Sequence, residues 1–453
     1  MGVPSDFASD VLAEAQQSAS HPQLTGVDAT DIPFVTVDPP GSTDLDQAVH
    51  LTPDGDGFVV RYAIADVGSF VRPGGALDAE THRRGETLYF PDARVPLHPP
   101  LLSEGAASLL PGQIRPAVLW TMTLGADGAV RAVDVVRAKV RSIAQLDYPG
   151  VQAALEAGRL PGPIAALPAV GQARLALARA RHSINLDLPE QVVAPGGPLG
   201  WTLSLRADLD VERYNAEISL LTGMCAARIM IDGGYGILRT VPPPEEGAVA
   251  DLRRAAAALG VDWPDGAAPG DVLATVDRTD PHQAAVIEHA VSLLRGAAYT
   301  VFDGPPPAQP LHSGIGAAYT HVTAPLRRLV DRYAAEICLH LHAGTPVPAW
   351  VRSALPTLPA EMAGADRRAH EIDRAVVDAT EAFVLRDQVG SVFEAVVIAA
   401  DGKAGTVVLD DLAVRARCVG ANLPVGERVR VRLTSADVTA RTVRFERVDG
   451  SHP

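Results

Sequence analysis

The chain has 453 residues, 47% of them hydrophobic, and a formal net charge of −15 at pH 7. This length predicts more than one domain, or one large domain with appendages. No apolar stretch approaches the roughly 20 residues that a membrane-spanning helix needs, and residues 1–21 lack the basic start and apolar run of a secretory signal, so we expect a cytoplasmic protein with no membrane partner.

Cysteine usage and net charge each bear on the class of function. Cys225, Cys338 and Cys418 are far apart, and without a CxxC pair they predict neither a zinc site nor a redox centre. We expect them to be small buried hydrophobic residues. The acidic charge argues mildly against a nucleic-acid partner, because phosphate binding needs local positive charge, but a positive channel inside an acidic body would meet that need.

The predicted elements change from strands to helices along the chain. Residues 1–30 form a short arm with a helix at Ser5–Ala19. Turn signals then separate strands predicted at Phe34–Val37, Ala48–Leu51, Phe58–Ala65 and Ala117–Thr123. Helical periodicity follows at Val151–Ala157, Val170–His182, Val211–Asp232, Leu252–Leu259, Gln283–Tyr299, Arg327–His342 and Ala360–Arg386. This order predicts an α+β domain over residues 31–386.

In residues 387–448 the hydrophobic pattern changes from helical periodicity to strand-like alternation. Five short alternating segments occur at Gly390–Ile398, Gly405–Leu409, Val414–Val419, Arg428–Leu433 and Thr442–Val448. Five strands in so short a span are typical of an OB-fold β-barrel. This part is slightly basic whereas the remainder is acidic, so we expect it to bind nucleic acid. Residues 449–453 form a tail.

An acidic loop follows the first predicted strand. Asp38, Asp44 and Asp46 lie close together in the sequence, and in an extended segment Asp44 and Asp46 point to the same face. Pro39-Pro40-Gly41 lets the chain bend so that Asp38 can approach them. Oxygen ligands favour Mg²⁺ or Mn²⁺ over zinc, and such a site suits phosphoryl transfer. A solvated acidic turn that caps a strand is the alternative interpretation.

A second motif is Tyr319-Thr-His-Val-Thr-Ala-Pro-Leu-Arg-Arg328. Pro325 can occupy the first turn of the helix that follows. Arg327 and Arg328 near a helix N-terminus would add two cationic forks to amide donors that already suit phosphate, with Thr320, His321 and Thr323 as further donors. Alternatively, the two arginines form a surface pair with carboxylates such as Asp331.

Aromatic residues offer weaker signals. Tyr89 and Phe90 lie in a loop flanked by proline, where they could stack on bases or plug the core. His312 before Gly314 and Gly316 is a weak motif, and such a histidine is usually structural.

Together these segments resemble the ribonuclease II and ribonuclease R family of exoribonucleases, over residues 31–448. That family carries Asp, five residues, Asp, one residue and two adjacent Asp after a strand. Asp38, Asp44 and Asp46 match the first three positions, and Gln47 replaces the fourth. The Tyr62–Asp66 segment, the Arg84–Asp92 loop, Glu217 with Leu220-Leu221, and Thr323–Arg328 also look like the family, as does the C-terminal barrel, which is similar to its S-one RNA-binding domain.

The resemblance implies a processive 3′-to-5′ hydrolase of single-stranded RNA that releases nucleoside 5′-monophosphates. Asp38, Asp44 and Asp46 would hold Mg²⁺, with Gln47 as a neutral fourth ligand, and Asp46 would be the most sensitive position. Arg327 would grip the scissile phosphate, and Tyr89 would stack near the 3′ end beside a second aromatic that the sequence does not locate. The residues expected to contact RNA are Tyr89, Arg327, Arg328, Thr323, His321 and Phe393. We expect a monomer.

Two departures from the family change these expectations. Gln47 offers a neutral oxygen in place of a carboxylate, which predicts a higher Mg²⁺ requirement or a preference for Mn²⁺. The family usually begins with cold-shock-type RNA-binding domains, which a 30-residue arm cannot hold. This predicts weaker dependence on RNA length and a different tolerance for duplex RNA.

Two other functions fit parts of the sequence. The first is an RNA-binding protein of the same fold that has lost catalysis, as Gln47 would allow, although Asp38, Asp44, Asp46 and Arg327 are retained. The second is a hydrolase of a small phosphorylated metabolite, which would have little use for a C-terminal RNA-binding barrel.

Overall fold

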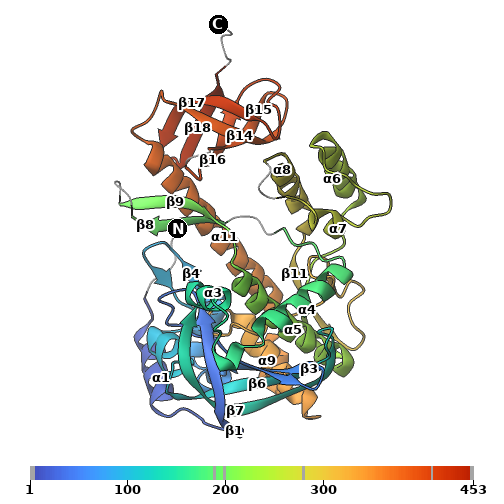
Figure 1. Cartoon of the computed structure of the whole chain (residues 1–453). Helices are drawn as coiled ribbons and strands as arrows, with labels where there is room; N and C mark the ends of the chain where they lie inside the picture. The colour runs from blue at the N-terminus through green and yellow to red at the C-terminus, as the bar shows by residue number, and fades with distance from the viewer. Residues whose placement is uncertain (1–5, 187–189, 197–199, 278–280, 410–411, 449–453) are drawn as a thin grey trace.

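The computed structural model describes residues 6–186, 190–196, 200–277, 281–409 and 412–448. Two closed β-barrels lie at opposite ends of the molecule, and helices fill the region between them (Figure 1). The mixture of strands and helices with a barrel at the C-terminus confirms the predicted α+β class.

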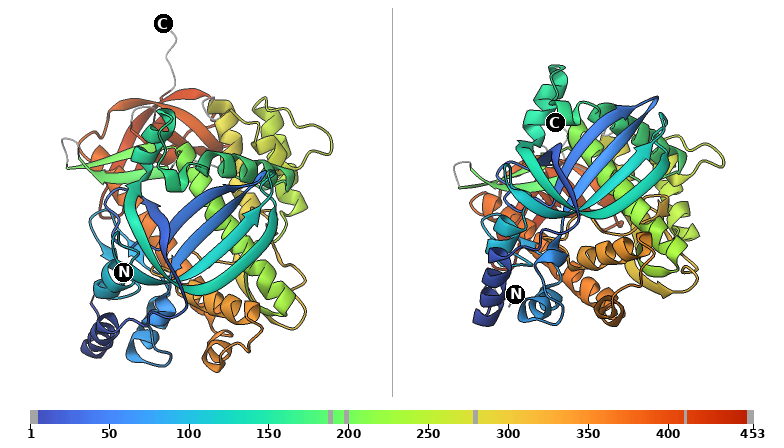
Figure 2. Two further views of the ribbon diagram at one scale, coloured as in Figure 1. Left: turned by 60° about the horizontal axis from the view of Figure 1, so that its bottom comes forward. Right: turned by 90° about the horizontal axis from the view of Figure 1, so that it is seen from below.

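The N-terminal barrel positions the acidic loop. Its strands are β1 (Val27–Asp38), β2 (Gln47–Asp54), β3 (Gly57–Ala65), β6 (Ile114–Leu124) and β7 (Val130–Asp147), paired in that order. A parallel pairing of β1 with β7 closes the barrel (Figure 2). Its register sets Asp38 opposite Asp147. Trp120 and Tyr62 are fully buried within it. The acidic loop therefore joins β1 to β2 at the barrel rim.

Helices cover the barrel and connect it to the second one. They are α1 (Ser9–Ser20), α2 (Ala76–Arg84), α3 (Tyr148–Glu156), α4 (Leu167–Ala180), α5 (Asp210–Gly233), α6 (Glu246–Ala258), α7 (Pro269–Leu273), α8 (Pro281–Ala290), α9 (Leu329–His342), α10 (Ala349–Ala354) and α11 (Leu358–Leu385). Short helical turns occur at η1 (Val67–Ser69), η2 (Leu102–Ala106), η3 (Gly162–Ile164) and η4 (Val291–Leu294). The buried faces of α5 and α9 continue the apolar core that begins inside the barrel.

Among the described residues, four two-stranded sheets complete this part. They are β4 (Leu88–Tyr89) with β5 (Arg94–Val95), β8 (Glu190–Pro195) with β9 (Trp201–Arg206), β10 (Tyr235–Thr240) with β11 (Ala298–Asp303), and β12 (Leu311–His312) with β13 (Ala317–Ala318). The β8–β9 hairpin lies beside α11, below the C-terminal barrel in Figure 1.

The C-terminal barrel confirms the five predicted strands. They are β14 (Val392–Ala400), β15 (Ala404–Leu409), β16 (Arg415–Val419), β17 (Arg428–Asp437) and β18 (Thr442–Arg447). Antiparallel pairs and one parallel pair, β16 with β18, close it. Ala382 and Leu385 at the end of α11 are buried in its core, so the long helix is fastened to the barrel by apolar contacts.

Several predicted elements differ from the structure. The helix predicted at Gln283–Tyr299 is wrong in its second half, because a helical turn ends at Leu294, Gly296 adopts a φ of 86°, and β11 begins at Ala298. The helix predicted from Arg327 begins at Leu329, so Pro325 does not lie in its first turn. Of the predicted N-terminal helix, Ser5 lies outside the described residues.

Two composition-based expectations can be compared directly with the structure. Cys225, Cys338 and Cys418 are buried, free thiols, as predicted. Within the described residues, no helix combines the length and apolar character that crossing a membrane would require.

Candidate active site

Three segments that are distant in sequence meet at the rim of the N-terminal barrel: residues 38–47, 85–94 and 323–328. Backbone hydrogen bonds from Thr87 N to Arg327 O (2.9 Å) and from Leu329 N to Gly85 O (2.9 Å) hold the second and third segments together. The bond from Leu326 N to Asp46 Oδ1 (2.7 Å) joins the third segment to the acidic loop. The structure thus brings the two main sequence motifs into one site.

Asp46 lies at the centre of this junction. It is only 5% exposed, and its Oδ2 lies 3.8 Å from Nε of Arg327. Burial raises the pKa of Asp46 well above its usual range, against the opposing influence of the Arg327 charge and the Leu326 amide. Arg327 itself keeps 47% of its side chain exposed, so it can reach a ligand while it faces the carboxylate.

Asp38 is the second carboxylate of the site. Burial raises its pKa to about 7, and the charge of Asp44 adds to the shift while Arg327 opposes it. Its Oδ2 is buried and has no hydrogen-bond partner among the described residues. A buried acceptor without a donor is costly, so this oxygen would be stabilised by a cation or by a hydrogen-bond donor.

Asp44 is bound by Tyr89 and by Arg94, a residue that the sequence analysis did not single out. Arg94 Nη1 donates to its Oδ1 at 3.0 Å, and the Tyr89 hydroxyl donates to its Oδ2 at 3.1 Å. Arg94 also contacts Glu104 at 2.6 Å. Tyr89, which is 45% exposed, is therefore anchored at its hydroxyl end.

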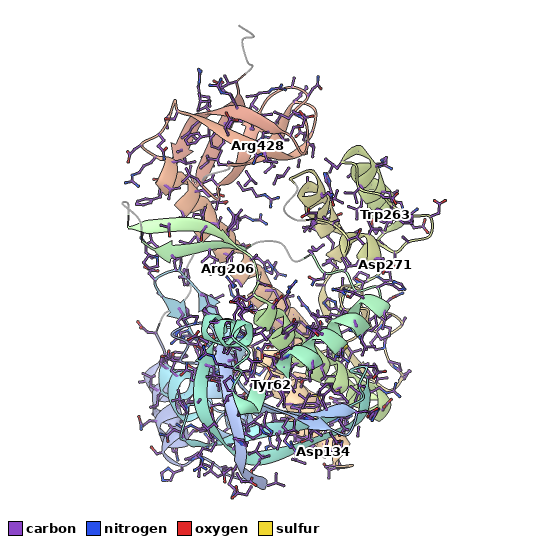
Figure 3. The ribbon with its side chains drawn as sticks, viewed as in Figure 1. Tyr62, Asp134, Arg206, Trp263, Asp271 and Arg428 are labelled. Carbon is purple, nitrogen blue, oxygen red and sulfur yellow. The ribbon has the colours of Figure 1, made fainter. Side chains whose placement is uncertain are left out.

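Gln47 is fully engaged with protein groups. Its Nε2 donates to the Thr323 carbonyl at 2.6 Å, and its Oε1 accepts from the Tyr62 hydroxyl at 2.7 Å. Tyr62, labelled in Figure 3, lies 2.9 Å from Ser219 Oγ on α5. Gln47 thus links β2, α5 and the Thr323 turn, and its amide oxygen is already an acceptor in this network.

Arg328 has a different environment from Arg327. Its Nε and Nη2 donate to the two oxygens of Asp331 at 2.6 and 2.9 Å. Asp331 is fully buried and also accepts from Ala324 N at 2.7 Å. This pairing corresponds to the alternative interpretation of the motif for Arg328, although the pair lies inside the protein rather than on its surface.

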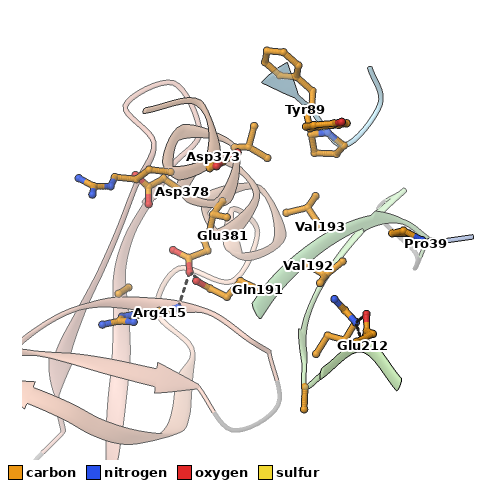
Figure 4. Close-up of a pocket in the computed structure, with 18 of the residues that line it drawn as sticks. Pro39, Tyr89, Gln191, Val192, Val193, Glu212, Asp373, Asp378, Glu381 and Arg415 are labelled. Atoms are coloured by element: carbon orange, nitrogen blue, oxygen red, sulfur yellow. Dashed lines mark hydrogen bonds and ion pairs between the residues drawn. The ribbon is translucent and has the colours of Figure 1, made fainter. Parts of the chain in front are cut away.

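A large cavity extends from this site toward the C-terminal barrel. It has a volume of about 1130 Å³, and Tyr89, Tyr148, the β8–β9 hairpin, the second half of α11 and strand β16 line it (Figure 4). A smaller cavity of about 170 Å³ is lined by Arg327, Arg328 and Glu86, and both cavities share Tyr89 and Asp373. The shared residues connect the large cavity to Arg327.

Tyr148 is an aromatic residue of the large cavity that the sequence analysis did not single out. It follows β7 directly, where Asp147 caps α3 by accepting from Gly150 N at 2.7 Å. Asn215 donates to its hydroxyl at 3.0 Å. Asp147 before Tyr148-Pro149 is a helix-capping pattern that could have placed Tyr148 at the start of a helix. It was not used, because β7 was not predicted.

The other residues predicted to contact RNA are engaged with protein groups. His321 bonds to the Tyr299 hydroxyl at 2.6 Å and belongs to an aromatic group with Tyr319. Thr323 is buried and bonds Gln47 through its carbonyl. Phe393 on β14 packs edge-on against Phe445. None of these three residues lines either cavity.

Comparison with known proteins identifies the architecture. Residues 27–342 match the RNB domain, and residues 391–448 match the RNase II-type exonuclease C-terminal S1 domain. The chain belongs to the RNB family. The RNB family relatives include ribonuclease R of Escherichia coli, 27% identical over 92% of this chain, and exosome complex exonuclease RRP44 homolog A of Arabidopsis thaliana, 29% identical over 72% of it.

The chain spans 57% of the E. coli protein and 37% of the Arabidopsis one. Among solved structures, Mycoplasma genitalium RNase R in complex with ribose-methylated single-stranded RNA shares the fold, with a TM-score of 0.85 and 19% identity over 98% of this chain and 76% of that one. Yeast Ssd1, a pseudonuclease, also shares it, with a TM-score of 0.73 and 17% identity over 94% of this chain and 53% of that one. The fold alone therefore does not distinguish a nuclease from a pseudonuclease.

The acidic loop supplies the ligand type that a hard divalent cation prefers, but its carboxylates are not grouped around one position. Carboxylate oxygens are the ligands that Mg²⁺ and Mn²⁺ prefer, and Asp38 presents a buried oxygen without a partner. Across the described ranges, however, no three or more His, Cys, Asp or Glu side chains are grouped so that they could hold a metal ion. Asp44 is held by Arg94 and Tyr89 instead.

Proposed function

We propose that this protein is a metal-dependent exoribonuclease that degrades single-stranded RNA processively from the 3′ end and releases nucleoside 5′-monophosphates. Its RNB family membership supports RNA hydrolysis. The observation that carries the proposal is the bond between Leu326 N and Asp46 Oδ1, which sets the acidic loop against Arg327 across 280 residues of sequence.

Asp38 and Asp46 would hold Mg²⁺ or Mn²⁺, and Asp44 would join them after release from Arg94. The bound cation would activate water and stabilise the leaving oxygen of the phosphodiester. Arg94 keeps Glu104 as a partner when Asp44 leaves it, at 2.6 Å. The exchange therefore leaves no buried charge unpaired.

Arg327 would bind the scissile phosphate. Its guanidinium is half exposed and faces Asp46 at 3.8 Å, so it can donate to a phosphate oxygen while the carboxylate keeps it oriented. Tyr89 and Tyr148 would stack on bases near the 3′ end, because both line the cavity that adjoins Arg327. Arg328 would act indirectly, by fixing the turn through Asp331.

The test is digestion of a 5′-labelled oligo(A) with Mg²⁺ or Mn²⁺, resolved to single nucleotides, with RNA binding measured in parallel. The proposal predicts a ladder that shortens one nucleotide at a time and release of 5′-AMP, both abolished by EDTA. Internal cleavage, or release of 3′-monophosphates, would contradict it.

A catalytically inactive RNA-binding protein is the second candidate, and Gln47 favours it. Both ends of the Gln47 amide are committed to Tyr62 and Thr323, so the position supplies no carboxylate to a second cation. Tight binding of oligo(A) with no release of AMP under either metal would support this candidate over the first.

A further inference from the structure

A second cavity lies on the other side of helix α5 from the active site. It has a volume of about 450 Å³ and lies between the end of α4, the first half of α5, α7 and the β12–β13 turn. Asp271, labelled in Figure 3, is on the α7 side of it. Glu217 lines this cavity, whereas Ser219, 200° further around the helix, contacts Tyr62. The cavity and the active site are therefore separate.

The cavity contains a buried carboxylate without a partner. Glu217 is 6% exposed, and its Oε2 has no hydrogen-bond partner among the described residues. Burial raises its pKa, against the opposing charges of Arg174 and Arg181. An unpartnered buried acceptor normally has a donor, water or ion beside it, so Glu217 points to a missing donor.

Arg174 and Arg181 act on Glu217 through their charges without pairing to it, and of these two only Arg181 lines the cavity. Arg174, 4% exposed, bonds Gly128 O at 2.9 Å and leaves its Nε without a partner. Among the described residues, the Arg181 side chain makes one hydrogen bond, from its Nε to Ile315 O at 3.4 Å. Neither makes an ion pair with Glu217 within the described part of the chain, and Arg179, which also lines the cavity, makes no ion pair there. Buried opposite charges normally pair directly.

The remaining charges of the cavity wall are already paired. Arg213 contacts Asp210, and Asp271 bonds His182 at 2.8 Å. Leu175, Ile184 and Leu220 add an apolar wall. A ligand that completes the site must therefore present an anion to Arg179 and Arg181, hydrogen-bond donors to Glu217, and an apolar face.

We propose that this cavity binds a nucleoside monophosphate, with the phosphate on Arg179 and Arg181 and a guanine base on Glu217. Guanine presents two adjacent N–H donors on its Watson–Crick edge, which match the two oxygens of a carboxylate. Its ring would pack on Leu175 and Leu220. The choice of a nucleotide rests on the proposed function, because such nucleotides would be its products, whereas the site rests on the unpaired groups.

The experiment is equilibrium binding of GMP, AMP, CMP and UMP to the full chain in EDTA. We expect GMP to bind on the order of tenfold more tightly than the others, as a bidentate pair discriminates. Glu217→Gln should lower GMP affinity to that of AMP, since the amide supplies only one acceptor. Arg179→Ala combined with Arg181→Ala should weaken all four ligands alike. Arg228→Ala, an exposed arginine of α5 paired with Asp232, is the matched control and should change nothing.

Two results would overturn the proposal. GMP binding that survives Glu217→Gln and disappears in Arg327→Ala would place the nucleotide in the active site. Absence of binding by all four nucleotides would show that water alone fills the gap. The Glu217→Gln protein should fold, because the change removes a buried charge, and a melting curve verifies this. Glu217-dependent GMP binding without RNA degradation would uphold this site while refuting the proposed function.

Discussion

Arg327 and Arg328 are adjacent, yet the structure gives them different tasks. Arg327→Ala should lower the rate of RNA hydrolysis by about 10²- to 10³-fold, as loss of a preorganised donor does, with little change in stability because the side chain is half exposed. Arg328→Ala should instead lower the free energy of unfolding by about 3–5 kcal/mol, because it leaves the buried Asp331 carboxylate without its cationic partner. Denaturant melts and single-turnover rates of both variants measure this contrast. Equal destabilisation by the two substitutions would contradict it.

Gln47 is a residue whose environment decides the outcome of a substitution. Gln47→Asp shortens the side chain and loses the bonds to Tyr62 and Thr323, so the free energy of unfolding should fall by about 1–3 kcal/mol. It also adds a carboxylate beside Asp46, so the Mg²⁺ requirement should fall. Gln47→Glu is the control for loss of the donor. It keeps an acceptor for the Tyr62 hydroxyl but cannot donate to the Thr323 carbonyl. A Mg²⁺ titration that shows an unchanged or higher requirement in the Asp variant would refute the prediction.

At the scale of elements, Glu381 fastens α11 to the C-terminal barrel and the β8–β9 hairpin. Its Oε1 accepts from Arg415 N at 2.7 Å and from Gln191 Nε2 at 2.9 Å. Glu381→Ala should leave Arg415 N without its acceptor, whereas Gln191 Nε2 still donates to Ala413 O at 2.7 Å. The free energy of unfolding should therefore fall by about 1–3 kcal/mol, and Glu381→Gln, which keeps an acceptor, should cost less. Thermal melts compare the two variants. Identical melting temperatures would show that the apolar contacts of Leu385 alone hold the junction.

At the scale of the whole molecule, the acidic loop should make metal binding depend on pH. Burial raises the pKa of Asp38 to about 7, so below this pH a proton competes with the cation for the same oxygens. The half-saturating Mg²⁺ concentration should therefore fall by up to about tenfold per pH unit as pH rises from 6 to 7, and then level off. Asp38→Asn should flatten this dependence. A requirement that does not change with pH in the wild type would contradict the assignment of Asp38.

The sequence predicted local patterns better than long-range contacts. The C-terminal barrel was predictable because each strand alternates and ends in a turn signal. The link from Asp46 to Leu326 was not, because a pattern cannot show which segments meet. For the same reason, the sequence showed two adjacent arginines but not which of them binds Asp331. In the structure it is Arg328. Tyr148 was missed because β7, the strand that it directly follows, was not among the predicted strands.

The most direct test of the account is single-turnover hydrolysis of the terminal linkage of a single-stranded RNA by wild type and Asp46→Asn, with RNA affinity measured separately. Asparagine keeps an acceptor for Leu326 N, so the fold and the affinity for RNA should change little. The account predicts a loss of rate on the order of 10³-fold or more. An Asp46→Asn protein that cleaves RNA at the wild-type rate would contradict it.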